Sequence, residues 1–296
     1  MKESGVSWGM MDVDVFKKCV DDLKRFPEKI KKIKIGNHGE PTLHPDLPEM
    51  IRYARDSQVA DVIEMFTNGS KLCPSLNQKL VDSGLQRINI SVEGLTQESY
   101  KKIAGFNIDY DEFVRNIADL YQRKTPDLSM YIKVVDHAVV KSEPGKPTID
   151  LSQEDKNYFY ELFGSISDEM SIENVVPQWA ETDQNDLTDT GMYGQKISKL
   201  KKVCPFPFMY LHVNSDGTVA GCTLDWARKV LVGKIDSVNS ASLFDVWNGD
   251  QMKELRLKML RGERESIPMC DTCNAPNVCV IDDLDPSMSE LIARYK

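Results

Sequence analysis

Apolar residues in the first 178 positions recur in two alternating patterns. Runs at helical spacing, such as Phe16, Cys19, Val20 and Leu23, alternate with short apolar runs bounded by glycine or polar residues. The short runs predict strands at 32–35, 62–66, 87–92, 130–135 and 172–176, and the helical runs predict helices at 16–23, 47–55, 76–81, 100–104, 113–121 and 158–163. Strands separated by helices imply βα units and a parallel sheet, curved into a full or partial (β/α) barrel.

The first predicted element is a helix, whereas a parallel barrel normally opens with a strand. Without a preceding strand, the strand at 32–35 would have an unpaired edge. We therefore expect either a fold that tolerates this edge or a chain that begins after the first strand of the barrel.

The polar stretch at 180–194 marks a boundary in the chain, because its composition is that of a solvated linker or lid. After it, the pattern predicts a β-hairpin from strands at 208–213 and 218–222, joined by the turn Asn-Ser-Asp-Gly. A strand near 230–235 and helices at 242–247 and 251–260 follow. We predict two domains: a partial parallel barrel at 1–190 and a small α+β domain with a β-hairpin at 191–296.

Four cysteines of the second domain have the spacing of ligands. Cys204 and Cys222 flank the predicted hairpin, which brings Cys222 back toward Cys204, and Cys270 and Cys273 form a CxxC pair. Four thiolates around one point suit either zinc or an iron–sulfur cluster. The alternative is four unrelated buried thiols, since free cysteine often packs as a small hydrophobic residue.

Composition narrows the class of protein. The chain is 41% hydrophobic, and no apolar run approaches the ~18 residues that a membrane span requires. A net charge of −9 argues against nucleic acid as the main partner. Seven cysteines, several at metal-like spacing, favour a reducing compartment, so we expect a cytoplasmic protein that binds neither membrane nor nucleic acid.

Polar loops follow three of the predicted strands. They comprise Gly36 to Pro41, Thr67 to Gly69, and Ser91 to Glu93. Functional residues of parallel α/β folds lie at the carboxyl ends of strands, so we expect these loops to meet at one mouth of the barrel. Each loop alone is more often an ordinary turn.

The chain resembles the radical S-adenosylmethionine (SAM) enzymes that carry a SPASM-type C-terminal domain. Gly39-Glu40-Pro41 is similar to the family's Gly-Gly-Glu-Pro motif, with His38 in place of the first glycine. Thr67-Asn68-Gly69 matches a second family motif, and further positions match strands of the family's barrel. The resemblance implies a SAM site formed by His38, Gly39, Glu40, Pro41, Thr67, Asn68, Ser91, Glu93 and Lys133.

The C-terminal part is similar to the SPASM signature. The matching spacings are Cys204-x12-Gly217-x4-Cys222 and Cys270-x2-Cys273-x5-Cys279. The resemblance implies one auxiliary [4Fe–4S] cluster held by Cys204, Cys222, Cys270 and Cys273, because four thiolates complete such a cluster. On this interpretation Cys279 is spare.

Two departures from the family pattern change the expected activity. The printed sequence contains no CxxxCxxC, the three-cysteine motif that binds the catalytic cluster in the family. We therefore expect that the chain begins just after that loop, that a second [4Fe–4S] cluster requires the missing segment, and that these residues alone do not cleave SAM. No cysteine follows Cys279, which favours one auxiliary cluster.

The function implied by the resemblance is that of a radical SAM/SPASM oxidoreductase. In such an enzyme a 5′-deoxyadenosyl radical abstracts hydrogen from a peptide or a sugar/aminocyclitol substrate, and flavodoxin or ferredoxin supplies electrons. Individual catalytic residues are not predicted. Two alternatives stay open: a degenerate, non-catalytic iron–sulfur paralogue, and a zinc protein with an all-thiolate site.

Overall fold

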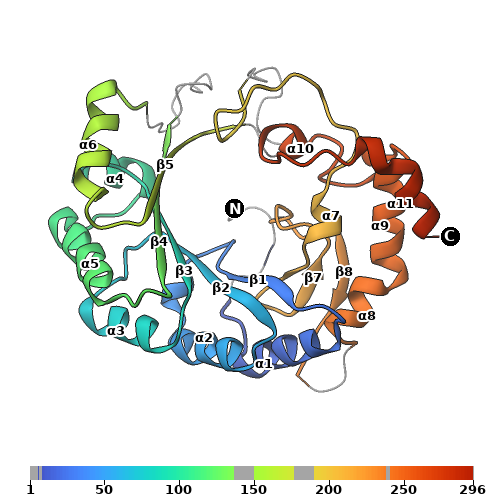
Figure 1. Ribbon diagram of the computed structural model, residues 1–296, viewed down its shortest axis with the longest axis horizontal. Coiled ribbons are helices and arrows are strands. Elements are labelled where there is room, and N and C mark those ends of the chain that lie inside the picture. The colour runs from blue at the N-terminus through green and yellow to red at the C-terminus, as the bar shows by residue number, and fades with distance from the viewer. Residues whose placement is uncertain (1–5, 7–8, 137–149, 177–189, 238–240, 296) are drawn as a thin grey trace. The chain divides into compact units, whose positions relative to one another are not determined.

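The computed structural model describes residues 6, 9–136, 150–176, 190–237 and 241–295. By its contacts the chain divides into two compact units (Figure 1). We call Pro27–Val175 the barrel unit, and Met1–Phe26 together with Val176–Lys296 the cysteine unit.

The described residues of the barrel unit form a five-stranded sheet in which every neighbouring pair of strands is parallel. The strands follow one another in sequence order: β1 (Ile30–Ile35), β2 (Ala60–Thr67), β3 (Arg87–Val92), β4 (Ser129–Asp136) and β5 (Glu169–Asn174). The helices of the unit are α2 (Leu47–Asp56), α3 (Pro74–Asp82), α4 (Gln97–Ala104), α5 (Tyr110–Arg123) and α6 (Gln153–Phe163). The predicted parallel α/β sheet is thus confirmed, and β1 stands at one edge of it.

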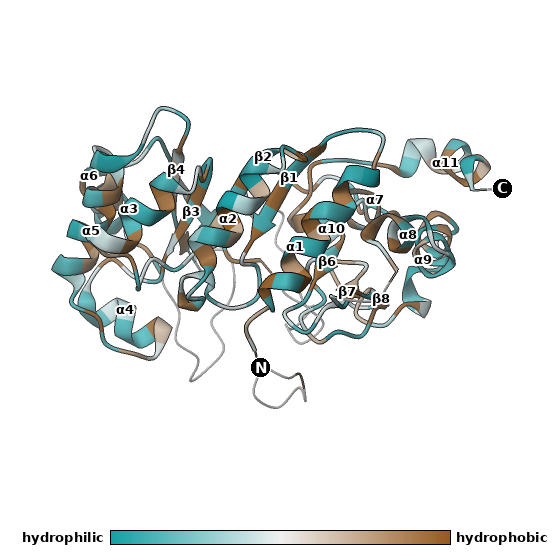
Figure 2. Cartoon of the chain, turned by 90° about the horizontal axis from the view of Figure 1, so that it is seen from below, coloured by the Kyte–Doolittle hydropathy of each residue, from teal (hydrophilic) through white to brown (hydrophobic). Residues whose placement is uncertain are grey.

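The hydrophobic core of the barrel unit lies between the sheet and its helices. Met130, Ile132 and Val134 alternate along β4 with less buried residues, so one face of the strand is fully covered. On α5, Ile117 and Leu120 recur at helical spacing and are fully buried. Figure 2 shows hydrophilic and hydrophobic residues alternating along α2 and α5, as expected for helices with one packed face.

The other face of the sheet carries charged side chains that are paired across the strands. Glu64 of β2 lies between Lys32 of β1 (Nζ to Oε2, 3.3 Å) and Arg87 of β3 (Nε to Oε1, 3.2 Å). Arg87 continues to Glu169 of β5 through two hydrogen bonds, the second 2.9 Å long (NH2 to Oε2). We call Lys32, Glu64, Arg87 and Glu169 the ion-pair ladder, which ties four strands together.

The cysteine unit combines a small antiparallel sheet with short helices. Its sheet has the order β6 (His212–Val213), β7 (Thr218–Ala220), β8 (Leu231–Lys234). Its helices are α1 (Val13–Asp22), α7 (Phe206–Met209), α8 (Leu243–Asn248), α9 (Asp250–Leu260), α10 (Ala275–Val278) and α11 (Met288–Arg294), with the 3₁₀ turns η1 (Leu23–Arg25), η4 (Arg264–Ser266) and η5 (Asp285–Ser287). Val203, Val219, Met252 and Leu260 are fully buried in the core of this unit.

The hairpin differs from its prediction at the first strand. Residues 206–209 form the helical turn α7, so within the predicted strand 208–213 the paired strand is limited to His212 and Val213. Pro205 and Pro207 explain the difference, because proline fixes φ near the helical value and suits the first turn of a helix. The predicted turn is correct: Gly217 has φ +79°, and a Cβ there would lie 2.1 Å from the Ile235 carbonyl oxygen.

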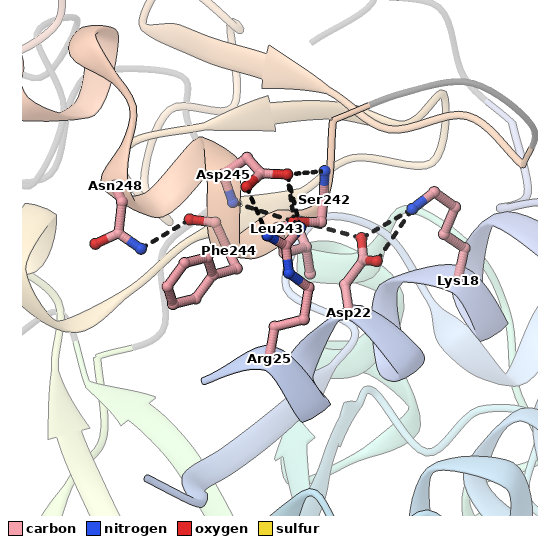
Figure 3. A network of polar contacts seen from close by, with 8 residues as sticks. All are labelled: Lys18, Asp22, Arg25, Ser242, Leu243, Phe244, Asp245 and Asn248. Atoms are coloured by element: carbon pink, nitrogen blue, oxygen red, sulfur yellow. Dashed lines mark hydrogen bonds and ion pairs between the residues drawn. The ribbon is translucent and has the colours of Figure 1, made fainter. Parts of the chain in front are cut away.

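Helix α1 is joined to the segment 242–248 by a network of polar contacts (Figure 3). Asp22 accepts a hydrogen bond from the Leu243 backbone N–H (3.0 Å) at the start of α8, and Lys18 pairs with the same carboxylate (3.0 Å). Arg25 forms a bidentate ion pair with Asp245 (2.8 and 3.0 Å). Contacts therefore group residues 1–26 with the C-terminal part of the chain, while the domain boundary at residue 190 stays a prediction.

Among the described residues, no helix has both the length and the apolar character needed to cross a membrane.

Candidate functional site

Four cysteines line one cavity of the cysteine unit. Cys204 precedes α7, Cys222 follows β7, and Cys270 and Cys273 lie between η4 and α10. The other lining residues are mostly apolar: Phe206, Pro207, Val230, Leu255, Met259, Arg264, Ala275 and Pro276. Within the described ranges, no group of three or more His, Cys, Asp or Glu side chains is arranged to hold a single metal ion.

The hairpin places Cys222 at this cavity. In β6 and β7, His212 pairs with Ala220 and Val213 with Val219, so the chain returns toward α7. Gly221 then passes close to α9, because a Cβ at this position would lie 2.3 Å from Leu255 Cδ2. Glycine therefore lets the returning strand approach the helix and carry Cys222 to the cavity.

Cys204 is buried and the other three thiols are half-buried, and removal from water raises the pKa values of all four. The pKa of Cys204 rises to about 12, mainly by burial and further by the nearby Cys273 and Cys270. The pKa values of Cys222, Cys270 and Cys273 are also raised, again chiefly by burial. A metal group that binds through these thiols must therefore displace their protons.

Arg264 lies at the same cavity and binds the CxxC segment. Its Nε donates to the carbonyl oxygen of Cys270 (3.0 Å), and NH2 donates to that of Cys273 (2.7 Å). The sequence analysis missed this residue, because a single arginine six positions before Cys270 has no distinctive spacing.

Arg256 holds the helical turn α7, whose residues Phe206 and Pro207 line the cavity. It is buried, donates to the carbonyl oxygens of Pro207 (2.9 Å) and Trp247 (2.8 Å), and lies 3.9 Å from the Trp247 ring centroid. Burial lowers its pKa. These contacts hold α7, and with it the chain that follows Cys204, against α9.

The remaining cysteines lie elsewhere. Cys279 ends α10 and is not among the lining residues. Cys19 is buried in the core of the cysteine unit, where burial raises its pKa to about 12. Cys73 stands at the N-cap of α3, and a hydrogen bond with Ser75 lowers its pKa.

In the barrel unit, the loops after β1 and β2 meet through Glu40. Its Oε1 accepts hydrogen bonds from the Thr42 backbone N–H (3.0 Å) and from the Thr67 hydroxyl (2.6 Å), and its Oε2 accepts one from the Asn68 N–H (2.8 Å). The Glu40 carboxylate therefore holds the two predicted loops together.

Glycine shapes the loop after β1. Gly36 has φ +78°, and a Cβ there would lie 2.7 Å from the Phe66 carbonyl oxygen. Gly39 has φ +101° and is exposed. Between them, His38 is half-buried and forms a hydrogen bond through Nε2 with the Asn37 amide (3.2 Å).

Ser91 and Lys133 are direct neighbours across β3 and β4. Lys133 Nζ pairs with Glu173 Oε2 (2.7 Å), and the Tyr131 hydroxyl donates to Glu173 Oε1 (3.1 Å). Glu173 was not predicted as a site residue, although a charged side chain near the carboxyl end of a strand is a usable signal.

Glu93 is a half-buried carboxylate just beyond β3. It accepts no hydrogen bond from the described residues, and burial raises its pKa while the charge of Lys133 partly opposes the rise. The hydroxyl of fully buried Tyr100 also has no hydrogen-bond partner among the described residues, and its pKa is raised by burial and by the charges of Glu93 and Glu40. A buried hydroxyl without a protein partner and a half-buried carboxylate therefore lie near the Glu40 loops.

Two family models match the chain. Residues 4–141 match the radical SAM superfamily, and residues 204–274 match SPASM, an iron–sulfur cluster-binding domain. The second match contains all four cavity cysteines. Proteins of the radical SAM superfamily are enzymes, and the two matches together imply iron–sulfur clusters and SAM. The matches confirm, for these two segments, the resemblance recognised in the sequence.

Curated relatives match part of the chain. A probable GTP 3′,8-cyclase of Methanococcus maripaludis is 44% identical over 101 residues, which are 34% of this chain and 32% of the relative. The corresponding protein of Metallosphaera sedula is 37% identical over 125 residues, 42% of this chain and 37% of the relative. The chain thus spans about a third of the length of these relatives.

Solved structures resemble the chain over most of its length. BtrN in complex with AdoMet and 2-DOIA matches with a TM-score of 0.55 and 18% identity, over 94% of this chain and 86% of BtrN. A histidine-tagged form of anSMEcpe with bound AdoMet matches with a TM-score of 0.58 and 14% identity, over 99% of this chain and 90% of anSMEcpe. At these identities the likeness concerns the fold, and it confirms the predicted fold class.

Proposed function

We propose that this chain forms the SAM-binding barrel and the auxiliary-cluster domain of a radical SAM/SPASM oxidoreductase. One observation carries the proposal: Cys204, Cys222, Cys270 and Cys273 line a single cavity within the segment that matches the SPASM model. Four thiolates complete the coordination of one [4Fe–4S] cluster. Such a cluster supplies one-electron transfer when bound.

The chain's own residues suit a buried cluster. Phe206, Val230, Leu255 and Met259 line the cavity with apolar surface, and Arg256 holds α7 in place. Cys279 lies outside this wall, in agreement with its assignment as spare.

SAM is proposed to bind where the polar loops of the barrel unit meet. The Glu40 carboxylate already accepts hydrogen bonds from both loops, so its role is to fix them and to present the backbone around His38, Gly39 and Pro41. Thr67 and Asn68 complete this part of the site.

Glu93 is the side chain in this region that is best placed to bind the SAM amino group, because its half-buried carboxylate still lacks a donor among the described residues. Ser91 and Lys133 border it on the neighbouring strands.

The substrate is proposed to be a peptide or a sugar/aminocyclitol from which hydrogen is abstracted, with flavodoxin or ferredoxin as reductant in the cytoplasm. The names of the structural neighbours support this range: BtrN was solved with 2-DOIA, and anSMEcpe has been solved with a bound peptide.

A second candidate substrate is a nucleoside triphosphate. It is favoured by the local identity to proteins named as probable GTP 3′,8-cyclases. Calorimetric titration with GTP, a cysteine-containing peptide and an aminocyclitol, each in the presence of SAM, separates the two: tight binding of GTP alone would replace the first proposal for the substrate.

Metal analysis after anaerobic reconstitution tests the cluster. We expect about four iron and four sulfide per chain. A Cys279→Ala variant, changed outside the cavity, should keep both. Zinc without sulfide would contradict the cluster assignment and support the zinc alternative.

Calorimetry with SAM tests the second part of the proposal. Glu93→Gln should weaken SAM binding by about tenfold or more, because a hydrogen bond to a charged partner is lost. The control Glu98→Gln changes an exposed residue of α4 and should leave affinity unchanged. If the two variants bind SAM with equal affinity, Glu93 is not part of the SAM site. Since the printed sequence lacks CxxxCxxC, we expect binding without cleavage of SAM.

A further inference from the structure

Arg264 is placed where it can act on a cluster held by the cavity cysteines. Of the described residues that line this cavity, it is the one that carries a permanent charge. Its two hydrogen bonds reach the carbonyl oxygens of Cys270 and Cys273, the two ends of the CxxC segment (3.0 and 2.7 Å). A guanidinium group suits this task because its donors are arranged in a rigid fork.

The backbone beside the CxxC segment is strained, which gives these hydrogen bonds a structural role. Met269, directly before Cys270, has φ +68°, a conformation that costs a non-glycine residue about 1–2 kcal/mol. The turn is closed by hydrogen bonds from the Cys270 and Asp271 N–H groups to the Ile267 carbonyl oxygen (3.0 and 3.2 Å). Arg264 adds two contacts from outside the turn, so it helps to hold both cysteines in the geometry that faces the cavity.

The charge of Arg264 acts in surroundings that screen it weakly. The other lining side chains are apolar or thiols, and Arg264 itself is only partly exposed. An opposing carboxylate is that of Asp225, which interacts with Cys222 and Cys270 and accepts hydrogen bonds from the Lys229 and Val230 N–H groups (2.9 and 2.6 Å). Reduction of a cluster adds one electron and therefore one negative charge, which a nearby cation favours.

We propose that Arg264 is a positioning residue that raises the reduction potential of the auxiliary cluster and holds the CxxC segment around it. This inference rests on the proposed cluster ligands. It assigns Arg264 two separable effects: its charge sets the potential, and its forked hydrogen bonds set how firmly the cluster is held.

The test is a redox titration of the reconstituted chain with dithionite, followed by electron paramagnetic resonance. Arg264→Gln removes the charge and should lower the equilibrium constant for reduction by about tenfold, a shift of ~59 mV to more negative potential for a one-electron couple. Arg264→Lys keeps the charge and should stay within about threefold of the unchanged chain. It should still lose iron faster to excess EDTA, because a lysine cannot reproduce the fork.

Arg261→Gln is the matched control, since Arg261 is an exposed arginine three residues away that does not line the cavity. It should change neither the potential nor the rate of iron loss. If Arg264→Gln takes up no cluster, the Arg264→Lys variant becomes the test. A reduction potential near that of the unchanged chain, together with faster loss of iron, supports the proposal.

Two results would overturn the inference, and they can be told apart. An unchanged chain that binds no iron would remove the proposed cluster and the role of Arg264 together. If the unchanged chain binds about four iron and the two variants Arg264→Gln and Arg261→Gln have the same reduction potential, the cluster assignment is supported and the role of Arg264 is refuted.

Discussion

The two units of the chain place their functional groups in different ways. In the barrel unit, successive parallel strands end at one edge of the sheet, and charged residues on their polar face pair with each other, as Glu64 does with Lys32 and Arg87. In the cysteine unit, four thiols from separate segments line an apolar cavity with one cation. The charged side chains of the ion-pair ladder are thus paired within the barrel unit, whereas the cysteine unit presents groups that suit an added cofactor.

The difference indicates which interactions stabilise each unit. A sheet with paired charges and a covered apolar face should fold without a cofactor. The cysteine unit, with its short strands and short helices, gains more from a metal group, because binding contributes directly to folding free energy.

The largest expected effect comes from removing two cluster ligands. Cys270→Ala with Cys273→Ala should reduce iron from about four per chain to near zero and abolish the visible absorbance. We expect the cysteine unit to lose on the order of 3 kcal/mol or more, and hydrogen exchange to rise there while β2 to β4 stay protected. Retained colour in this variant would refute the ligand assignment, and equal loss of protection in both units would refute the contrast drawn above.

The next effect concerns the barrel unit alone. Glu64→Ala should destabilise it by about 3 kcal/mol, because Arg87 and the Asn89 amide (2.9 Å from Glu64 Oε1) lose a buried partner. Urea denaturation followed by circular dichroism measures the change. Asp61 lies on the same strand as Glu64, and it pairs with Lys29 at an exposed site. Asp61→Ala should therefore lower the free energy of unfolding by at most about 0.5 kcal/mol. Similar losses in the two variants would show that the ladder is not stabilising.

A smaller effect is expected at helix α1. Asp22→Ala removes the acceptor of the Leu243 N–H and should cost about 1–2 kcal/mol. The loss should appear as faster hydrogen exchange in α8 and α9. Asp21→Ala, which breaks an exposed pair with Lys24, should leave exchange there nearly unchanged. Unaltered protection of α8 in the Asp22 variant would contradict the role assigned to this carboxylate.

The smallest expected effect concerns how much the Glu93 carboxylate lowers the free energy of unfolding. Burial raises the pKa of Glu93, so the folded protein holds this proton more tightly than the unfolded chain, and the resulting stabilisation is present at low pH and lost as pH rises through the raised pKa. Glu93→Gln should therefore stabilise the ligand-free chain by about 1 kcal/mol or less near neutral pH.

Melting temperatures at about pH 4.5 and pH 7.5 measure this difference, which should shrink at the lower pH. Glu98→Gln serves as the exposed control on α4. A stabilisation that grows toward acid pH would contradict a raised pKa for Glu93.

The strands were predictable because their apolar residues are local and periodic. The predicted strand 62–66 lies within β2 (Ala60–Thr67), and 87–92 coincides with β3. The prediction failed where local rules compete: Phe208 to Val213 alternates like a strand, yet two prolines direct residues 206–209 into a helical turn.

Contacts between distant residues were not predictable in the same way. Glu64 and Arg87 are 23 positions apart, and only the register of β2 and β3 places them opposite each other. Nothing in the pattern around Arg264 marks it as a partner of the CxxC carbonyl groups, and nothing around Asp22 marks it as a partner of Leu243.

The sequence by itself determined the parallel α/β pattern, the polar loops at the strand ends and the spacing of the four cysteines. These depend on periodicity, turn chemistry and ligand spacing, which act over a few residues. Only the tertiary structure decided that Glu40 joins two loops, that Glu93 is half-buried near Lys133 and that Arg264 lines the cavity of the thiols. Such contacts depend on how packed elements bring remote side chains together, and no local propensity encodes that geometry.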